Sequence, residues 1–292
     1  MGGGCREPAV RVGCDGASGG ELVMVVVAKP LTRRLIIAWT ACVVAFLYIP
    51  IVCVFLVSFH KARYFSFPFS DFTLDWYGKA FSSLQTQELM LVSLKVAGVV
   101  TAISVVLALF GALAFARFNW RGRKLFQRLL LLPIFFPQAV LGLALLIWLT
   151  FLGVLPSWQS AVFAHLVWIA PIVTLVVSIQ VYGYDAAQEE AAFDLGATRL
   201  QVLREVTLPA LAPGLVSGAL FAFLLSWGNF PLSFFTTGAD STVPEWLYTR
   251  MVAGYTPLVP TMGALIVIGA TIMLVLGYAL IVLRRRRANS HG

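Results

Sequence analysis

The chain has 292 residues, of which 60% are hydrophobic and only 12% are charged, and its mean hydropathy is +0.89. Because soluble domains are about half apolar and about a quarter charged, this composition excludes a chain that folds entirely in water. The formal net charge of +8 comes largely from basic residues within a few positions of apolar segments, which favours a lipid bilayer over a nucleic acid as the partner.

Long uncharged segments predict membrane spans, since a spanning helix needs about 20 mostly apolar residues. We predict six spans, at about residues 35–59, 91–116, 129–152, 158–182, 213–236 and 260–283. Unpaired backbone groups are costly in lipid, so spans must be helices or a closed barrel. The segments are continuously apolar and lack the alternation of barrel strands. We therefore predict an all-α membrane protein with a six-transmembrane-helix bundle.

This bundle is predicted to form one transmembrane domain over residues 29–287, between two tails. Residues 1–28 are rich in glycine and are predicted to be disordered, and residues 288–292 form a short C-terminal tail. Both Met1 and Met24 are candidate start residues, because a more typical approach to the first span begins at Met24. The apolar run of the first span is too long for the core of a cleaved signal peptide.

The distribution of Lys and Arg predicts the orientation of the bundle. The connection 117–128 contains five of these residues, and four arginines in a row, Arg284 to Arg287, follow the last span. The connections on the opposite side carry fewer basic groups. By the positive-inside rule, both termini are predicted to be cytoplasmic.

Motifs for catalysis are absent from the sequence. It contains no GxxxxGK[ST] phosphate-binding loop and no HExxH zinc motif. Its four cysteines form no CxxC pair, so a disulfide or metal role is not expected. We therefore expect no enzyme activity, no metal site and no cofactor in this chain.

Three residues within the spans are candidates for lining a pathway. Ionisable residues in spans are functional candidates by default, but His165 has no obvious carboxylate partner, and a neutral packing histidine is the favoured interpretation. Trp227 and Asn229 lie in the segment LLSWGNFPLSFF. Trp227 and Asn229 could either line a pathway or serve in packing, and the sequence leaves both roles open.

A charged island interrupts the apolar pattern between the fourth and fifth spans. Seven charged residues lie within 185–209. Thr198 and Gln201 have the spacing of a capping box, Gly196 suits the left-handed end of a helix, and Pro209 limits a helix. We predict two short helices joined at Gly196. Most helix–helix connections are shorter, which favours a docking surface over a plain solvated loop.

The segment EAAFDLGATRLQVLREVTLP resembles the EAA loop of the permease subunits of binding-protein-dependent ABC importers. The matching positions are Glu190, Ala191, Ala192, Gly196, Ala197, Val206, Leu208 and Pro209. Val206 stands where isoleucine is more usual. The resemblance extends over about residues 30–285, where FSDFTLDWYGKAF and LLLPIFFPQAVLGLALL are similar to segments of spermidine/putrescine-type permeases.

This resemblance implies a type I ABC importer permease fold in which residues 185–209 form the coupling loop. The implied ATPase-coupling residues are Glu190, Ala191, Ala192, Gly196, Ala197, Leu208 and Pro209. The implied partners are two copies of a separate ATPase subunit, which would bind ATP and Mg²⁺, a second homologous permease subunit and an extracytoplasmic solute-binding protein. The implied location is the bacterial inner membrane, as a multi-pass protein.

The same resemblance implies import of a small organic solute, with a polyamine favoured. Near the end of the fifth span the polyamine subgroup often carries Ser-Phe-Asp-Asp, whereas residues 226–229 here are Ser-Trp-Gly-Asn, without either acid. An opine, an aminophosphonate or another amine derivative is the alternative solute. A stand-alone channel or an exporter is the alternative class, and neither would need the charged loop.

Overall fold

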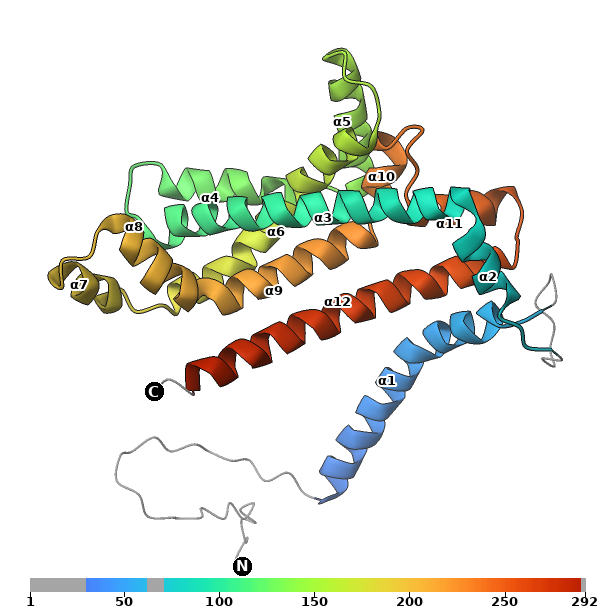
Figure 1. The fold of residues 1–292 in the computed structure, drawn as a ribbon, viewed down its shortest axis with the longest axis horizontal. Coiled ribbons are helices and arrows are strands. Elements are labelled where there is room, and N and C mark those ends of the chain that lie inside the picture. Colours follow the sequence, from blue (N-terminus) through green and yellow to red (C-terminus); the bar gives the residue numbers. More distant parts are fainter. Residues whose placement is uncertain (1–29, 62–70, 290–292) are drawn as a thin grey trace, which may run out of the picture. The chain divides into compact units, whose positions relative to one another are not determined.

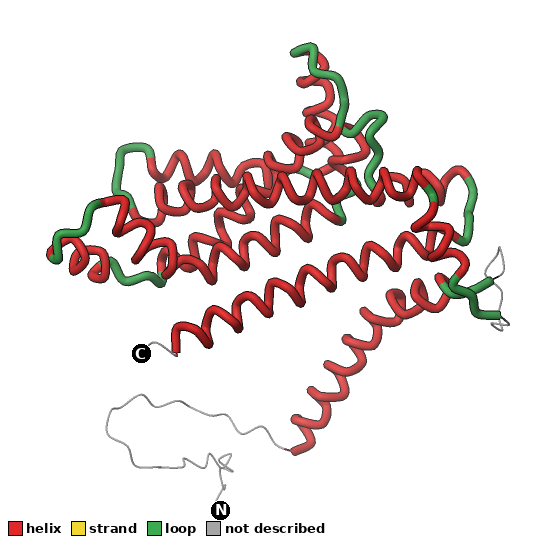
Figure 2. Tube along the Cα trace, viewed as in Figure 1, coloured by secondary structure: helices red, strands yellow, loops and turns green. Residues whose placement is uncertain are grey.

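The structure is a computed structural model that describes residues 30–61 and 71–289 (Figures 1 and 2). Within these ranges the secondary structure is helical, apart from an isolated bridge between His60 and Phe72. The predicted N-terminal tail, residues 1–28, lies outside the described residues, as do residues 290–292 of the predicted C-terminal tail.

The helices follow one another along the chain with short connections. The first half contains α1 (Pro30–Ser58), α2 (Asp75–Ser82), α3 (Leu84–Ala112), the π-helical turn η1 (Leu113–Arg117), α4 (Arg123–Leu131), the 3₁₀ turn η2 (Leu132–Phe135) and α5 (Gln138–Phe151). The second half contains α6 (Trp158–Tyr182), α7 (Ala187–Asp194), α8 (Arg199–Gln201), the π-helical turn η3 (Val202–Thr207), α9 (Leu208–Trp227), α10 (Pro231–Thr236), α11 (Val243–Ala253) and α12 (Leu258–Asn289).

Several helices are long and apolar enough to cross a membrane. In the described part of the chain there are five, Leu31–Ser58, Leu84–Ala112, Trp158–Tyr182, Arg199–Trp227 and Leu258–Ala279. A sixth span results if the bent pair Arg123–Phe135 and Gln138–Phe151 counts as one. The prediction of an all-α membrane protein is confirmed, and the number of spans agrees with six when the bent pair is one span.

The third predicted span, 129–152, is corrected by the structure, because it is broken rather than continuous. The helix that ends at Phe135 is bent by 104° from α5. Pro133 lies in the 3₁₀ turn η2, and Pro137 directly precedes α5. Proline lacks a backbone N–H and disfavours helical geometry in the residue before it, so two prolines this close end one helix and start another.

The fifth predicted span, 213–236, is corrected at both ends. Its helix begins at Arg199, inside the island, and continues through Pro209 to Trp227. The second short helix predicted for the island is therefore not separate. Pro209 lies in the first turn of α9, directly after the π-helical turn η3, whose wider hydrogen-bond spacing relieves the need for the missing N–H.

Two compact units divide the chain, residues 1–49 and residues 50–292. The described part of the first unit is the segment of α1 up to Ile49. Pro50, inside α1, begins the second unit. All the features described below lie in the second unit.

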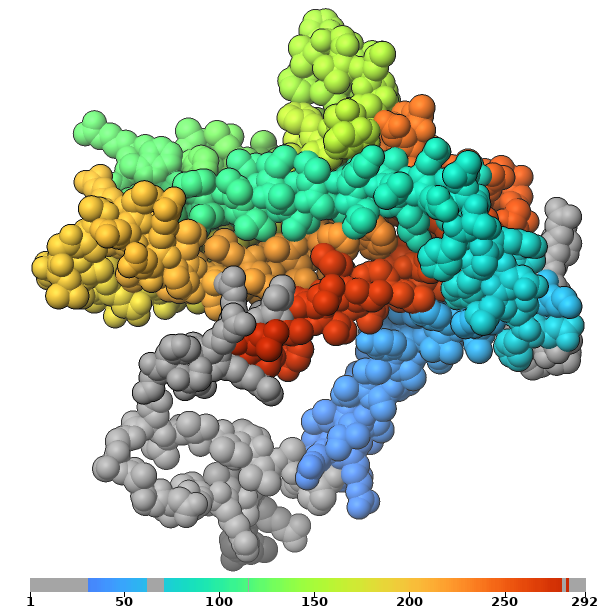
Figure 3. Space-filling model, in the orientation of Figure 1, coloured from blue at the N-terminus to red at the C-terminus, as the bar shows by residue number. Residues whose placement is uncertain are grey.

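The second unit is built around α3, α6 and α9, which lie side by side (Figure 1). Fully buried residues from the three helices form one apolar core, among them Val100 of α3, Ile169 and Val177 of α6, and Leu211 and Ala222 of α9. The island leaves this three-helix bundle at one end, between α6 and α9 (Figure 3).

Two glycines allow α9 to approach α6 closely. Gly214 and Gly218 have the small-xxx-small spacing that predicts tight helix contacts in membranes. A Cβ atom at Gly214 would lie 2.6 Å from Cβ of Gln180, and one at Gly218 would lie 3.0 Å from a methyl group of Val177. The backbone of α9 therefore lies directly against the side chains of α6.

We predict that Gly214→Ala destabilises the chain by about 1–3 kcal/mol, because the added methyl group overpacks the contact between α6 and α9. Thermal unfolding of the purified chain in detergent measures this change. Gly98→Ala is the matched control, since Gly98 lies within α3 and a Cβ atom there meets nothing within 4 Å. The control should keep or raise the stability by up to about 1 kcal/mol through helix propensity. Equal unfolding temperatures for the two variants would contradict the packing role of Gly214.

Candidate functional site

Helix α7 presents an exposed surface at the end of the three-helix bundle (Figure 3). Glu190 and Ala191 are exposed on it. Phe193 is 44% exposed, and Leu195, at the end of the helix, is 90% exposed. Neighbouring exposed apolar side chains beside charged groups are typical of a protein–protein contact. Phe193 and Leu195 were not predicted as contact residues from the sequence, although two large apolar residues beside small and acidic ones were a usable signal.

The end of α7 is closed by a glycine in the left-handed conformation. Gly196 has φ +85°. Its N–H donates to the carbonyl of Phe193 at 2.9 Å, and the N–H of Ala197 donates to the carbonyl of Ala192 at 3.0 Å. These two bonds form a Schellman motif, which satisfies carbonyls left free at a helix end. The predicted helix end at Gly196 is therefore present.

The next helix begins with the predicted capping box. The Thr198 hydroxyl accepts the N–H of Gln201 at 3.4 Å, and the Gln201 side-chain oxygen accepts the N–H of Thr198 at 2.8 Å. The turn between α7 and α8 is thus bounded by local hydrogen bonds on both sides. Such a turn has little freedom to change the angle between the two helices.

Glu189 ties α7 to two neighbouring elements. One carboxylate oxygen accepts from the Arg117 guanidinium at 2.7 Å, and the other accepts from the Thr207 hydroxyl at 2.6 Å. Arg117 ends η1, which continues α3, and Thr207 ends η3, which leads into α9. The Arg117 and Glu189 side chains are 21% and 14% exposed, and theirs is the one ion pair among the described residues.

Tyr184 lies beside this ion pair. The Arg117 guanidinium is 5.5 Å from the centre of the Tyr184 ring. Burial, and then the neighbouring Glu189 carboxylate, raise the pKa of the Tyr184 phenol above its ordinary value, while Arg117 opposes this rise. The ring is therefore neutral at physiological pH and serves as an aromatic surface for the guanidinium.

The sequence analysis selected Glu190 and missed Glu189. Neighbouring residues on an α-helix point about 100° apart. Only one of the two can turn toward the bundle, and in the structure it is Glu189, whereas Glu190 is exposed. The sequence does not reveal the rotation of α7 about its axis, so it could not separate the two roles.

The predicted coupling residues fall into two neighbouring groups. Glu190, Ala191, Ala192, Gly196 and Ala197 lie on α7 and its closing turn. Leu208 and Pro209 lie at the start of α9. The bond from Glu189 to Thr207 joins the first group to the residue directly before the second.

His165 belongs to a buried polar cluster near the C-terminal end of α9, the end away from α7. It is fully buried on α6. Its Nδ1 lies 2.8 Å from the Ser226 hydroxyl of α9, and its Nε2 lies 3.0 Å from the Ser233 hydroxyl of α10. A neutral imidazole has one donor and one acceptor nitrogen, which matches two hydroxyl groups. The geometry favours the packing interpretation, with His165 bridging the break between α9 and α10.

Asn229 lies within this break and is buried. Its side-chain oxygen accepts the N–H of Leu232 at 3.1 Å, and its nitrogen lies 3.4 Å from the Gln138 side-chain oxygen. Trp227 is also buried, but it faces α12, where its N–H donates to the carbonyl of Ile266 at 3.0 Å. The structure therefore brings His165 and Asn229 to the same break, and it turns the side chain of Trp227, which also borders the break, toward α12.

A buried carboxylate lies beyond α10, at Glu245 in the first turn of α11. It accepts from the Thr237 hydroxyl at 2.6 Å and from the N–H of Thr242 at 3.4 Å. Burial raises the pKa of Glu245, and hydrogen bonds from Thr237 and Thr242 oppose the rise. The oxygens of this carboxylate are thus used inside the fold.

Comparison with known proteins defines the class. Residues 104–287 match the family described as the inner membrane component of binding-protein-dependent transport systems. The match covers more than half of the chain, and the chain therefore belongs to this family, the permease subunits of ABC importers.

Relatives and a solved structure agree with this membership. The chain is 30% identical over 252 residues to the spermidine/putrescine transport system permease protein PotC of Haemophilus influenzae, which covers 85% of this chain and 95% of the relative. It is also 28% identical over 233 residues to the putrescine transport system permease protein PotI of Escherichia coli K12. This match covers 76% of this chain and 81% of the relative. The fold is also similar to that of a chain of the bacterial alginate ABC transporter, whose structure was solved with an alginate pentasaccharide-bound periplasmic protein. The TM-score is 0.62 at 16% sequence identity, and the match covers 85% of this chain and 92% of that chain. The predicted importer permease fold is confirmed.

We predict that Glu189→Gln loosens α7. The neutral amide of glutamine lacks the negative charge that strengthens the hydrogen bonds of Glu189 with Arg117 and Thr207. The loss of charge-assisted hydrogen bonds should cost about 1–3 kcal/mol. Hydrogen–deuterium exchange of residues 187–197 should become faster in this variant. Glu190→Gln is the matched control, because Glu190 is exposed and makes no side-chain hydrogen bond within the described chain. Equal exchange in the two variants would show that Glu189 does not hold the helix.

Proposed function

We propose that this chain is the transmembrane permease subunit of an ATP-driven importer and that α7 is the coupling helix that receives the motion of a separate ATPase subunit. One observation carries the proposal. An exposed helix at the end of the bundle, which bears the Glu-Ala-Ala residues that open the pattern, is tied to the segments that continue into α3 and α9 by Glu189.

The docking surface is supported by what α7 leaves exposed. Glu190 supplies a charge, Ala191 permits close approach, and Phe193 and Leu195 supply apolar area. Apolar side chains at the centre of a contact and charges around it are typical of protein interfaces. The 90% exposure of Leu195, next to the half-exposed Phe193, supports a surface that a partner covers in the assembled importer.

The transmission of motion is supported by the contacts behind α7. A displacement of α7 reaches α3 through the ion pair of Glu189 with Arg117, and it reaches α9 through the bond to Thr207. The helix from Arg199 to Trp227 is continuous, so a displacement of its η3 segment also displaces its membrane part. The capped turn at Gly196 limits the loss of motion within the island itself.

The assembly that follows from this function has several parts. Two ATPase copies would supply energy and bind ATP and Mg²⁺, a second homologous permease would complete the pathway, and an extracytoplasmic binding protein would deliver the solute. The family description and the periplasmic partner of the alginate transporter support this arrangement. The bacterial inner membrane is the proposed location, with both termini and α7 on the cytoplasmic side, where the basic residues of 117–128 and 284–287 gather. A channel or an exporter that works alone would leave α7 without a role.

We predict that Gly196→Val uncouples ATP hydrolysis from transport while the membrane helices stay folded. A Cβ atom at Gly196 meets nothing within 4 Å in this chain, so within the chain the change acts through the left-handed backbone, at a cost of about 1–2 kcal/mol. The assay uses the complex purified from native membranes through a tag on this chain, with ATPase activity and solute uptake measured in proteoliposomes. Gly153→Val is the matched control, because Gly153 has φ +77° and equally open space.

Uptake should be lost in Gly196→Val and retained in the Gly153→Val control. Normal transport by both variants would contradict the coupling role of α7. Absence of an ATPase subunit from the purified complex would contradict the importer assignment itself.

The solute is proposed to be a polyamine of the spermidine or putrescine type. Support comes from the two relatives, which are named as permeases for these compounds. The acids that the subgroup often carries near the end of the fifth span are absent here, and Asn229 is engaged by Leu232 and Gln138. We therefore propose that the external binding protein sets most of the specificity. An opine, an aminophosphonate or another amine derivative is the second candidate.

We predict that a thermal-shift screen of the cognate binding protein will show its largest stabilisation with spermidine or putrescine. A ligand at 100 times its Kd stabilises a protein by about 2.7 kcal/mol, which gives a clear shift. The screen includes sugars and amino-acid derivatives as comparison classes. Stabilisation by a sugar, with none by any amine, would refute the polyamine proposal and leave the importer assignment intact.

A further inference from the structure

The segment from Asn119 to Arg128 forms a basic surface that the coupling mechanism does not use. Of the five Lys and Arg residues in 117–128, Arg117 is paired with Glu189. The other four, Arg121, Arg123, Lys124 and Arg128, make no ion pair within the described part of the chain. The segment itself contains no acidic residue that would neutralise them.

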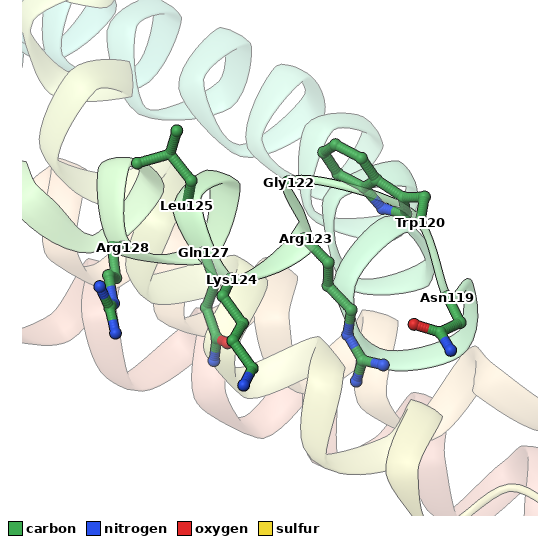
Figure 4. Close-up of a pocket in the computed structure, with 8 residues that line it drawn as sticks. All are labelled: Asn119, Trp120, Gly122, Arg123, Lys124, Leu125, Gln127 and Arg128. Carbon is green, nitrogen blue, oxygen red and sulfur yellow. The ribbon is translucent and has the colours of Figure 1, made fainter.

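The basic side chains are gathered on one side of α4. Figure 4 shows Arg123, Lys124, Gln127 and Arg128 extending to the same side of the helix, whereas Leu125 extends to the other. Three of the basic groups, Arg123, Lys124 and Arg128, line an open pocket of about 700 Å³ together with Trp120. Several cations around one hollow surface present a site for a phosphate group, to which guanidinium and ammonium groups donate.

The turn before α4 is held in place by local contacts. Gly122 has φ +94°, and a Cβ atom there would lie 3.1 Å from the Trp120 ring. The Trp120 N–H donates to the carbonyl of Ala114 at 2.8 Å, and its ring packs against Phe126 at 5.9 Å between centroids. The wall of the pocket is therefore preorganised.

An apolar row begins at Leu125, which also lines the pocket, and runs along a different side of α4 from the basic groups and into η2. Leu125, Leu129 and Leu132 are 60%, 59% and 50% exposed, and their spacing of four and three residues places them on one face. A helix with a cationic side and an adjoining apolar side is typical of the boundary between lipid headgroups and acyl chains. Trp120, 43% exposed at the start of the segment, is the residue type enriched at that boundary.

We propose that this surface binds the headgroup of an anionic phospholipid of the surrounding bilayer. The lipid phosphate lies in the pocket against Arg123, Lys124 and Arg128, and an acyl chain follows Leu125, Leu129 and Leu132. Charge complementarity and the apolar row that continues from the pocket favour a lipid. An acidic surface of the ATPase subunit would use the basic groups but not the exposed leucines. The inference concerns the membrane part alone and does not depend on which solute is carried.

The test measures lipid retained by the full chain after passage through nanodiscs of phosphatidylcholine and phosphatidylglycerol in equal parts. The chain is re-extracted in mild detergent, and its bound lipids are quantified by native mass spectrometry. The variant Lys124→Gln/Arg128→Gln removes two exposed charges from the pocket. The control Arg33→Gln/Arg34→Gln removes two exposed charges from α1, which make no ion pair within residues 30–61 and 71–289.

The original chain and the control should retain phosphatidylglycerol in preference to phosphatidylcholine. Each Lys or Arg near an anionic lipid surface adds to the attraction. The Lys124→Gln/Arg128→Gln variant should therefore retain less phosphatidylglycerol, by roughly tenfold or more. Equal loss in the control would mean general surface charge and would overturn the proposal. Undiminished lipid in the pocket variant, with the ATPase subunit no longer co-purifying, would assign the surface to the protein partner and also overturn it. Unchanged unfolding temperatures for both variants verify that the fold is intact, and the single change Lys124→Gln serves if the double variant unfolds.

Discussion

The close approach of α6 and α9 is the contact on which the rest of the structure depends. Gly214 and Gly218 lack side chains, so the α9 backbone lies against Gln180 and Val177 of α6. Helix α6 ends at Tyr182, and the helix that contains α9 begins at Arg199, so α7 is held between these two helices. Close-packed interiors transmit displacement instead of absorbing it. The α6–α9 pair is thus a rigid base for the island.

On this base, α7 is held by contacts rather than by its own length. It has eight residues, and isolated helices below about 12–15 residues are marginal in water. The Schellman motif at Gly196 closes one end, and Glu189 fixes the side that faces the bundle. The opposite side, with Glu190 and Leu195, stays exposed. One short helix therefore combines an anchored side with a side available to a partner.

Polar residues inside the spans serve mainly to complete the fold. The break between α9 and α10 frees backbone groups that lipid cannot satisfy. Asn229 accepts the N–H of Leu232 there, and His165 joins Ser226 to Ser233 across the break. These residues were the natural candidates for contact with a solute, but their hydrogen-bonding atoms are already used.

The sequence by itself determined the features that depend on a few consecutive residues. Apolar length sets the spans, the missing Cβ of glycine permits the turn at Gly196, and the three-residue spacing of Thr198 and Gln201 builds the capping box. The spacing of Gly214 and Gly218 likewise indicated a close helix contact. Each of these patterns can be recognised within a few residues of sequence, whereas the partner helix that Gly214 and Gly218 contact, α6, cannot.

Only the tertiary structure decided the rest. Pro133 and Pro137 mark a break in the sequence, but the angle of 104° and the continuation of a helix through Pro209 are seen only in the folded chain. The choice of Glu189 over Glu190 depends on the rotation of α7, which is set by the position of Arg117, 72 residues earlier in the chain. Sequence patterns record where a side chain is along its own helix. Its partners across the bundle are fixed only when all the helices have packed, since packing selects the angle and rotation at which the buried polar groups are satisfied.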